Sequence, residues 1–125
     1  MTIAIIAGGR GYRSPQPSDL IWLDQMLGKL GILGVVTGGA SGADDLGRRW
    51  AEDLDIPVRI FKPDWSTHGS AAGPIRNQQM ADFLLLYHQR AVLLFPGGRG
   101  TASMRNIAKT SGIEVYDFTH LTPSP

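Results

Sequence analysis

Short apolar segments alternate along the chain with longer segments in which apolar residues recur every three or four positions. The short segments are rich in leucine and β-branched residues and are apolar at successive positions rather than at every second one. Strands that are buried on both sides have this pattern, which is typical of a parallel sheet covered by helices. The pattern predicts five strands: Ile3–Ala7, Ile32–Thr37, Val58–Phe61, Ala91–Phe95 and Ile113–Tyr116.

The segments between these strands have the period of amphipathic helices. Gly31 and Gly112 stand just before a strand, where helix C-caps are expected. Because strand–helix–strand units are right-handed, this α/β order predicts a Rossmann-like, doubly wound five-stranded parallel sheet with helices on both faces. The expected core-facing stripes are Leu20, Leu23, Leu27 and Leu30; Leu46, Trp50 and Leu54; Met80, Phe83, Leu84 and Tyr87; and Met104, Ile107 and Ala108.

Length and composition fit one domain. The chain has 125 residues, of which 42% are hydrophobic, and we expect a single domain over residues 1–118 followed by a Pro-rich tail over residues 119–125. No apolar run approaches the ~20 residues of a membrane span, and the first residues lack the basic and apolar regions of a signal peptide. A cytoplasmic protein without a membrane partner is therefore expected.

Charge and cysteine content exclude several classes of protein. The formal net charge of +1 lacks the basic excess of a dedicated nucleic-acid binder. The absence of cysteine excludes a disulfide scaffold, a thiolate zinc site and a cysteine nucleophile. No pair of histidines has metal-ligand spacing, so we expect neither a metal nor a cofactor.

The 16 glycines are the main departure from average composition. Three strand-to-helix turns hold three each, at the sheet edge where ligands of α/β proteins bind. Glycine lets a ligand approach the main chain, so that N–H groups and a helix N-terminus can hold an anion, although tight turns also use glycine for structural reasons alone. The three turns contain Gly8, Gly9 and Gly11; Gly38, Gly39 and Gly42; and Gly97, Gly98 and Gly100.

Two common nucleotide signatures are missing from these turns. A P-loop needs G-x-x-x-x-G-K-[ST], and neither GGASGAD nor PGGRGT supplies the lysine. A dinucleotide dehydrogenase has G-x-G-x-x-G after its first strand and a carboxylate near the end of its second. Here GGRGYRS lacks the third glycine and the second strand ends in Thr37 and Gly38, which argues against both phosphoryl transfer of the P-loop type and hydride transfer.

The segment KPDWSTHGSAAGPIRN, which precedes a helix expected to start near Pro74, is the longest loop candidate. Loops of this length in compact domains are usually functional or disordered, and its prolines and Trp65 favour order. Trp65 is a candidate to stack on a ligand ring, with capping of the core as the alternative. His68 is a candidate to titrate or to donate to phosphate, with a structural hydrogen bond as the alternative.

Charged side chains gather at the same edge of the expected sheet. Asp44 and Asp45 begin the second helix, where a carboxylate either favours the helix dipole or binds ribose hydroxyls, and Asp64 has the same ambiguity. Planar guanidinium groups suit bidentate recognition of phosphate. The arginine candidates are Arg10, Arg76 and Arg99.

Four motifs stand in order along the chain: AGGRGY, TGGASGADDLGRRWA, FKPDWSTHGSAAGPIRNQQMAD and LLFPGGRGTASM. On these motifs the chain resembles the YspA-like branch of the SLOG superfamily, the Rossmann-like group that includes the Lonely Guy phosphoribohydrolases and the DprA-type DNA-processing proteins. The resemblance covers roughly Ile3 to Val115. It implies a SLOG domain whose Gly-rich edge binds nucleotides or nucleotide-derived molecules, such as ADP-ribose or NAD derivatives, in settings that include phage and defence-associated genes.

Position by position, the resemblance implies that PGGRGT, from Pro96 to Thr101, binds phosphate through its main chain and Thr101. Arg76, in GPIRN, has a place similar to the helix-borne arginine that Lonely Guy enzymes use at the phosphoribosyl group. Those enzymes carry glutamate in a PGGxGTxxE pattern, where this chain has Met104. The carboxylate expected to support an oxocarbenium-like state during N-glycosidic cleavage is therefore missing.

These observations favour a binding module that senses or sequesters a nucleotide-derived small molecule. The alternative is an N-glycosidic hydrolase acting on a nucleoside monophosphate or an NAD-like substrate, with Arg76 at the phosphoribosyl group and a carboxylate from Asp44, Asp45 or Asp64. DprA-like binding of single-stranded nucleic acid has little support from a net charge of +1. The expected ligand-binding residues are Gly8, Gly9, Arg10, Gly38, Gly39, Gly42, Asp44, Trp65, His68, Arg76, Asn77, Pro96, Gly97, Gly98, Arg99, Gly100 and Thr101.

The run from Phe83 to Tyr87 is apolar around more of a helix than one core face requires. Part of it is expected to pack against a second subunit, with burial beneath the C-terminal tail as the alternative. Because relatives in the superfamily commonly self-associate, we expect a homo-oligomer with its ligand site near the interface.

Overall fold

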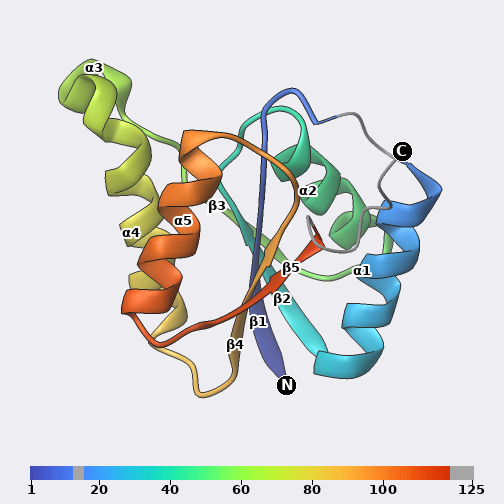
Figure 1. The fold of residues 1–125 in the computed structure, drawn as a ribbon. Helices are drawn as coiled ribbons and strands as arrows, with labels where there is room; N and C mark the ends of the chain where they lie inside the picture. Colours follow the sequence, from blue (N-terminus) through green and yellow to red (C-terminus); the bar gives the residue numbers. More distant parts are fainter. Residues whose placement is uncertain (13–15, 119–125) are drawn as a thin grey trace.

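The structure is a computed structural model that describes residues 1–12 and 16–118 (Figure 1). The Pro-rich tail expected over residues 119–125 lies outside the described residues. The elements in chain order are β1 (Thr2–Ala7), α1 (Pro17–Leu30), β2 (Ile32–Thr37), α2 (Ala43–Asp53), β3 (Val58–Ile60), α3 (Trp65–His68), the 3-10 turn η1 (Gly69–Ala71), α4 (Ala72–Leu84), β4 (Arg90–Leu94), α5 (Arg99–Thr110) and β5 (Glu114–Asp117).

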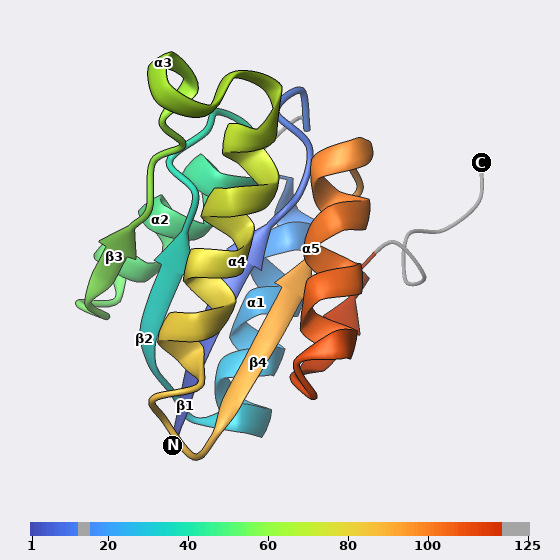
Figure 2. The same ribbon diagram turned by 90° about the vertical axis from the view of Figure 1, so that its left-hand side faces the viewer.

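The five strands form one parallel sheet in the order β3-β2-β1-β4-β5. The chain runs outward from β1 to β3 and then returns to β4, so the direction of winding reverses between β1 and β4. Helices α1 and α2 cover one face of the sheet, and α4 and α5 cover the other (Figures 1 and 2). The expected α/β, doubly wound, Rossmann-like architecture is therefore confirmed.

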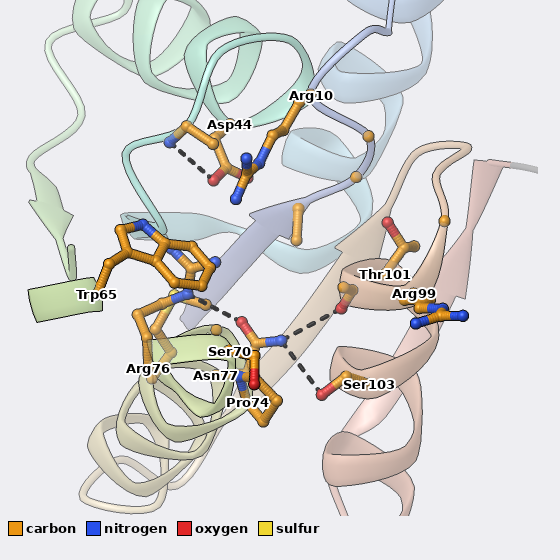
Figure 3. A pocket seen from close by; sticks show the side chains of 18 residues that line it. Arg10, Asp44, Trp65, Ser70, Pro74, Arg76, Asn77, Arg99, Thr101 and Ser103 are labelled. Carbon is orange, nitrogen blue, oxygen red and sulfur yellow. Dashed lines mark hydrogen bonds between the residues drawn. The ribbon is translucent and has the colours of Figure 1, made fainter. Parts of the chain in front are cut away.

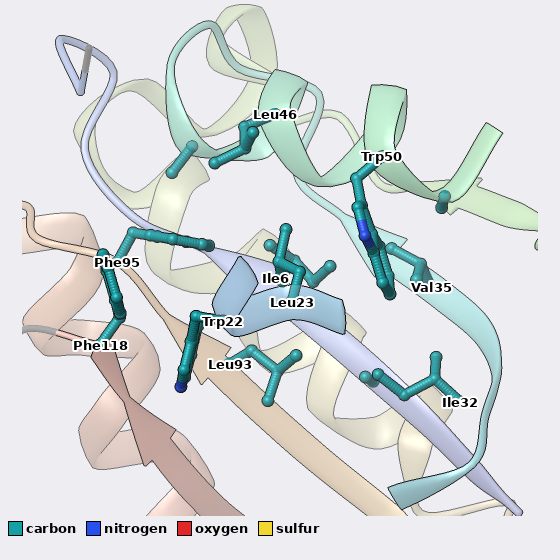
Figure 4. Packing of buried hydrophobic residues seen from close by; sticks show 13 residues of the cluster. Ile6, Trp22, Leu23, Ile32, Val35, Leu46, Trp50, Leu93, Phe95 and Phe118 are labelled. Atoms are coloured by element: carbon teal, nitrogen blue, oxygen red, sulfur yellow. The ribbon is translucent and has the colours of Figure 1, made fainter. Parts of the chain in front are cut away.

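The core between the sheet and helices α1 and α2 is rich in aromatic side chains (Figure 4). The Trp22 ring lies 5.2 Å from the Phe95 ring in an edge-to-face arrangement and 5.0 Å from the Phe118 ring. Trp50 is buried beside Leu46, and its indole N–H donates to the Asp24 carboxylate at 2.9 Å. These contacts fix the two helices against the sheet below the loops that follow β1 and β2.

The core on the other face is aliphatic. Met80 and Leu84 of α4 pack with Met104 and Ala108 of α5 against the central strands. All four side chains are fully buried. This packing holds the N-terminal ends of α4 and α5 side by side at the carboxyl edge of the sheet (Figure 2).

Several sequence-based boundaries and stripes need correction. Three residues expected in the core are exposed: Leu20, Leu54 and Tyr87. In α1, Trp22, which was not among the expected residues, is buried beside the expected Leu23. Tyr87 lies beyond the end of α4 at Leu84. The long loop after β3 is partly helical because it contains α3 and η1, and α4 begins at Ala72 rather than near Pro74.

The expected glycine at the end of α1 is confirmed, because Gly31 has a left-handed φ of 63° and its N–H donates to the Leu27 carbonyl. Gly112 also has a left-handed φ, of 73°, one residue after the C-cap Ser111. Across the described ranges, no helix is both long and apolar enough to cross a membrane.

Candidate functional site

A cavity of about 450 Å³ opens at the carboxyl edge of the sheet, where β1 and β4 end and the winding reverses (Figure 3). Loops after β1 and β2 form one side, the α3–α4 segment another, and the first turn of α5 a third. Eleven of the ligand-binding residues expected from the sequence line it: Gly8, Gly9, Arg10, Asp44, Trp65, Arg76, Asn77, Gly98, Arg99, Gly100 and Thr101.

Other expected residues do not line this cavity: Gly38, Gly39, Gly42, Asp45, Asp64, His68, Pro96 and Gly97. Several lining residues were missed by the sequence analysis, although Ser70, Gly73 and Pro74 belong to the long segment it singled out. Apart from its position in the fourth expected helix, nothing in the sequence marked Ser103 as a residue of the cavity. The residues missed are Ala7, Ala40, Ser70, Gly73, Pro74, Met80 and Ser103.

Several loop glycines allow the loops to pack against one another. A Cβ at Gly8 would lie 2.7 Å from the Ala43 Cβ, and a Cβ at Gly97 would lie 2.6 Å from the Gly9 nitrogen. Gly42 has a φ of 74°, and a Cβ there would overlap the Gly9 carbonyl. The Gly9 N–H also donates to the Pro96 carbonyl at 2.8 Å. These glycines bring the turns after β1, β2 and β4 together and thereby shape the cavity.

Gly98 and Gly100 are different, because a Cβ at either position would meet nothing within 4 Å. Gly98 is the N-cap of α5 and has no side-chain cap, and the first backbone bond into the helix runs from the Ala102 N–H to the Gly98 carbonyl. The N–H groups of the first helical turn have no partner within the helix. They are therefore accessible to an anion in the cavity.

The hydroxyl of Thr101 lies in the same turn and is buried, since the residue is only 5% exposed. Within residues 1–12 and 16–118, its Oγ1 atom has no hydrogen-bond partner. A buried hydroxyl without a partner costs free energy. Thr101 is thus a cavity-lining residue whose hydroxyl has hydrogen-bonding capacity that the described chain leaves unused.

Arg76 is held in place by hydrogen bonds within the protein. Its Nη1 donates to the Gly38 carbonyl at 2.6 Å, and its Nε donates to the Asn77 Oδ1 at 3.0 Å. Burial lowers the pKa of the guanidinium, while the nearby Asp44 carboxyl acts in the opposite direction. Since two of its three nitrogens are engaged, Nη2 is the donor that Arg76 can present to the cavity without breaking a contact.

Asn77 connects Arg76 to the first turn of α5. Its Nδ2 donates to the Gly100 carbonyl at 3.2 Å and to the Ser103 Oγ at 3.4 Å, and its Oδ1 accepts from Arg76 (Figure 3). Asn77 is buried, and both ends of its amide are used in these contacts. Asn77 thereby links α4 to the first turn of α5 beside the cavity.

Asp44 is a buried carboxyl at the start of α2. Its Oδ2 accepts from the Ala40 N–H at 3.1 Å. Burial raises the pKa of this carboxyl, and the Ala40 hydrogen bond and the charges of Arg76 and Arg10 partly oppose that increase. The cavity therefore contains one carboxyl that binds a proton more readily than an exposed aspartate does.

The two other aspartates considered from the sequence have local structural roles. Asp64 is the N-cap of α3, and its Oδ1 accepts from the Ser66 hydroxyl at 2.8 Å and the Thr67 N–H at 3.2 Å. These hydrogen bonds lower the pKa of its carboxyl. Asp45 pairs with Arg48 one turn along α2, at 2.7 Å.

The loop that carries Arg10 is anchored at Tyr12. The Tyr12 hydroxyl donates to the Asp19 carboxylate at 2.6 Å, and its ring lies 5.3 Å from the Phe95 ring. Burial and the Asp19 contact raise the pKa of this phenol, which stays neutral. The Arg10 guanidinium lies 5.5 Å from the centre of the Trp65 ring, whereas Arg99 is exposed at the cavity rim.

The position that carries glutamate in the Lonely Guy pattern points into the core. Met104 is fully buried and packs with α4 and the central strands. It does not line the cavity. Within the described residues, no group of three or more His, Asp or Glu side chains is arranged as metal ligands would be.

Comparison with known proteins supports the family suggested by these motifs. The family model described as YspA, cpYpsA-related SLOG family matches residues 2–68, which include the loops after β1 and β2 and the Trp65 segment. The chain is also similar to the Gene 61 protein of Mycobacterium phage D29, with 38% identity over 91 residues, 67% of this chain and 70% of that protein. Together with the parallel sheet and the glycine-rich cavity, these matches show that the chain belongs to the YspA, cpYpsA-related SLOG family.

Proposed function

We propose that this protein binds a nucleotide-derived small molecule in the cavity, with a phosphate group of the ligand at the first turn of α5. The observation that carries this proposal is the buried, unpartnered hydroxyl of Thr101 beside the open main chain of Gly98 and Gly100. A phosphate oxygen would accept from that hydroxyl and from the N–H groups of the turn. Family membership supports a nucleotide-related ligand.

The charges around the cavity support an anionic ligand. Arg10, Arg76 and Arg99 line it, against a single carboxyl at Asp44. About 450 Å³ also falls within the roughly 300–1,000 Å³ of small-molecule sites.

Isothermal titration calorimetry with AMP, ADP-ribose, NAD and inorganic phosphate tests the proposal. Thr101→Val removes the hydroxyl, and Gly98→Asp places a negative side chain at the open turn, so both variants are expected to weaken binding. Thr110→Val is the matched control, because Thr110 is exposed at the far end of the same helix. No binding of any of these compounds, or binding that Gly98→Asp leaves undiminished, would overturn the proposal.

A second candidate function is hydrolysis of an N-glycosidic bond, and the burial of Asp44 favours it. A carboxyl of raised pKa facing the cavity is suited to proton transfer, and Arg76 would present Nη2 to the phosphoribosyl group. Asp64 has no comparable place, because its carboxylate caps α3. In this candidate mechanism Asp44 replaces the missing glutamate.

Release of free base from AMP or NAD, followed by chromatography, separates hydrolysis from binding alone. Asp44→Asn is expected to abolish release while phosphate still binds, and Asp45→Asn serves as the matched control because its carboxylate pairs with Arg48 outside the cavity. Tight binding without any release of base favours the binding function.

A homo-oligomer is also proposed, on the exposed apolar residues that follow α4. Leu86 is 76% exposed, and Leu85 and Tyr87 beside it are exposed as well. Burial of such a patch against a second subunit would be favourable. Analytical ultracentrifugation tests this, and a Leu86→Glu variant is expected to shift the sedimenting species towards the monomer.

A further inference from the structure

Trp65 differs from the other two tryptophans in its exposure. Trp22 and Trp50 are 4% and 5% exposed in the core, whereas Trp65 is 46% exposed and lines the cavity. Leaving a large apolar ring half in water costs free energy that burial would recover. Trp65 therefore does not cap the core, which was the alternative expected from the sequence.

Local structure places Trp65 at the cavity. Asp64 caps the short helix that begins at Trp65, through its contacts with Ser66 and Thr67. The edge of the indole lies beside α4, at a residue without a side chain, since a Cβ added at Gly73 would be 3.6 Å from the ring. Trp65 thus begins a capped helical turn and presents a half-exposed ring between α4 and the cavity.

A planar cationic group already lies over this ring. The guanidinium of Arg10 lies 5.5 Å from its centre, and its charge also acts on Asp44 and Arg76 across the cavity. An arginine plane on a tryptophan face occupies the geometry that an aromatic ring of a ligand would take. If a ligand ring displaces the Arg10 guanidinium from Trp65, that guanidinium is free to contact a phosphate of the ligand.

Trp65 and Thr101 lie on opposite sides of the cavity (Figure 3). A ligand whose phosphate lies at the first turn of α5 would therefore extend its other end towards the indole. Base–aromatic stacking is the usual way in which proteins bind a nucleobase without reading its identity.

We propose that Trp65 is the stacking platform for the nucleobase of the ligand, in the position that the Arg10 guanidinium occupies in this structure. The inference rests on the proposed function and extends it, because it requires the ligand to carry a planar ring as well as a phosphate. Asp64 and Gly73 act as positioning residues for the platform.

Titration with AMP and with ribose 5-phosphate, which lacks the base, tests the inference. AMP is expected to bind roughly 5- to 150-fold more tightly, the range that corresponds to stacking on one aromatic side chain. Trp65→Ala is expected to abolish that difference, and Trp65→Phe to retain most of it. Thr101→Val is expected to weaken both compounds by the same factor.

Tryptophan fluorescence supplies a second measurement. AMP is expected to quench emission in the wild type and in Trp50→Phe, and not in Trp65→Phe, because Trp22 and Trp50 are buried away from the cavity. The thermal midpoint of Trp65→Ala checks that the exposed ring is not needed for folding.

Each outcome decides between the two proposals. Equal affinity for AMP and ribose 5-phosphate, or AMP binding that Trp65→Ala leaves unchanged, overturns the stacking platform. If Thr101→Val still weakens ribose 5-phosphate in that case, the phosphate site of the proposed function stands. Absence of binding by AMP, ADP-ribose, NAD, ribose 5-phosphate and inorganic phosphate alike overturns both.

Discussion

Replacement of Thr101 by valine is expected to raise the stability of the protein and to lower its affinity for a phosphate ligand. Valine has nearly the shape of threonine, so the substitution exchanges the hydroxyl for a methyl group and otherwise preserves the side chain. Thr101 is 5% exposed in the first turn of α5, and its hydroxyl is buried without a partner in the part of the chain that the structure describes. The two effects have one cause, which is the unused hydrogen-bonding capacity of that group.

The magnitude follows from the cost of an unsatisfied buried group. Such a group costs about 1–3 kcal/mol, which the methyl group recovers. For single domains somewhat smaller and somewhat larger than this one, each kcal/mol added to the free energy of unfolding raises Tm by roughly 2–8 °C. A hydrogen bond to a charged group contributes about 1.5–3 kcal/mol, so loss of the hydroxyl is expected to weaken phosphate binding by roughly 10- to 150-fold.

Thr37 provides an unusually close control. It is the other described residue whose buried hydroxyl lacks a partner, and it does not line the cavity. Thr37→Val is therefore expected to raise the free energy of unfolding by a similar amount while ligand affinity stays unchanged. Thr101→Ser, which keeps the hydroxyl, is expected to retain binding.

Urea denaturation and calorimetry with AMP measure the two quantities on the same preparations. If Thr101→Val lowers the free energy of unfolding, the hydroxyl has a stabilising partner and the reasoning is wrong. If affinity falls equally in Thr37→Val and Thr101→Val, the hydroxyl of Thr101 has no direct contact with the ligand.

Three further predictions test the cavity. Burial raises the pKa of Asp44 above its ordinary 3.8, so the folded protein holds that proton more tightly than the unfolded chain does. The free energy of unfolding of the wild type, relative to that of Asp44→Asn, is therefore expected to fall as the pH rises from 3.8 through the raised pKa. Urea denaturation curves of the two proteins that keep a constant separation across this pH range would contradict the prediction. Arg76→Lys loses the two donors that anchor the guanidinium and is expected to lower the free energy of unfolding by about 1–3 kcal/mol. Arg99 is exposed, so Arg99→Lys is expected to change the free energy of unfolding by less than about 0.5 kcal/mol. Equal effects of the two substitutions would argue against the anchoring role of Arg76. Gly100→Ala adds a methyl group to open space within α5 and is expected to raise thermal stability by up to ~1 kcal/mol, whereas Gly38→Ala is expected to lower it because its Cβ would overlap the Arg76 guanidinium.

The architecture was largely predictable from the sequence. Residues buried on both faces of a parallel sheet form continuous apolar runs, and β2 has the bounds expected from its run, Ile32–Thr37. Boundaries were less well predicted where the apolar pattern is incomplete. The short helix α3 has no buried residue, so its Asp64 cap was the only signal for it.

The candidate site was only partly predictable. Glycine at the turns indicated the sheet edge, but composition does not distinguish a glycine that permits two loops to touch, such as Gly8, from one that faces open space, such as Gly98. Likewise, the sequence offered Asp44 and Asp64 as equivalent carboxylates, although burial raises the pKa of one and helix capping lowers that of the other.

The sequence by itself therefore determined the order of elements, the parallel sheet and the edge at which polar and glycine residues collect, because these depend on local periodicity and on which residues follow each strand. The tertiary structure decided which side chains meet there. In that packing Thr101 has an unpartnered hydroxyl, Arg76 is anchored by the Gly38 carbonyl, and Trp65 keeps a half-exposed ring beneath Arg10. Hydrogen-bond partners and burial are properties of that packing, which no local pattern encodes.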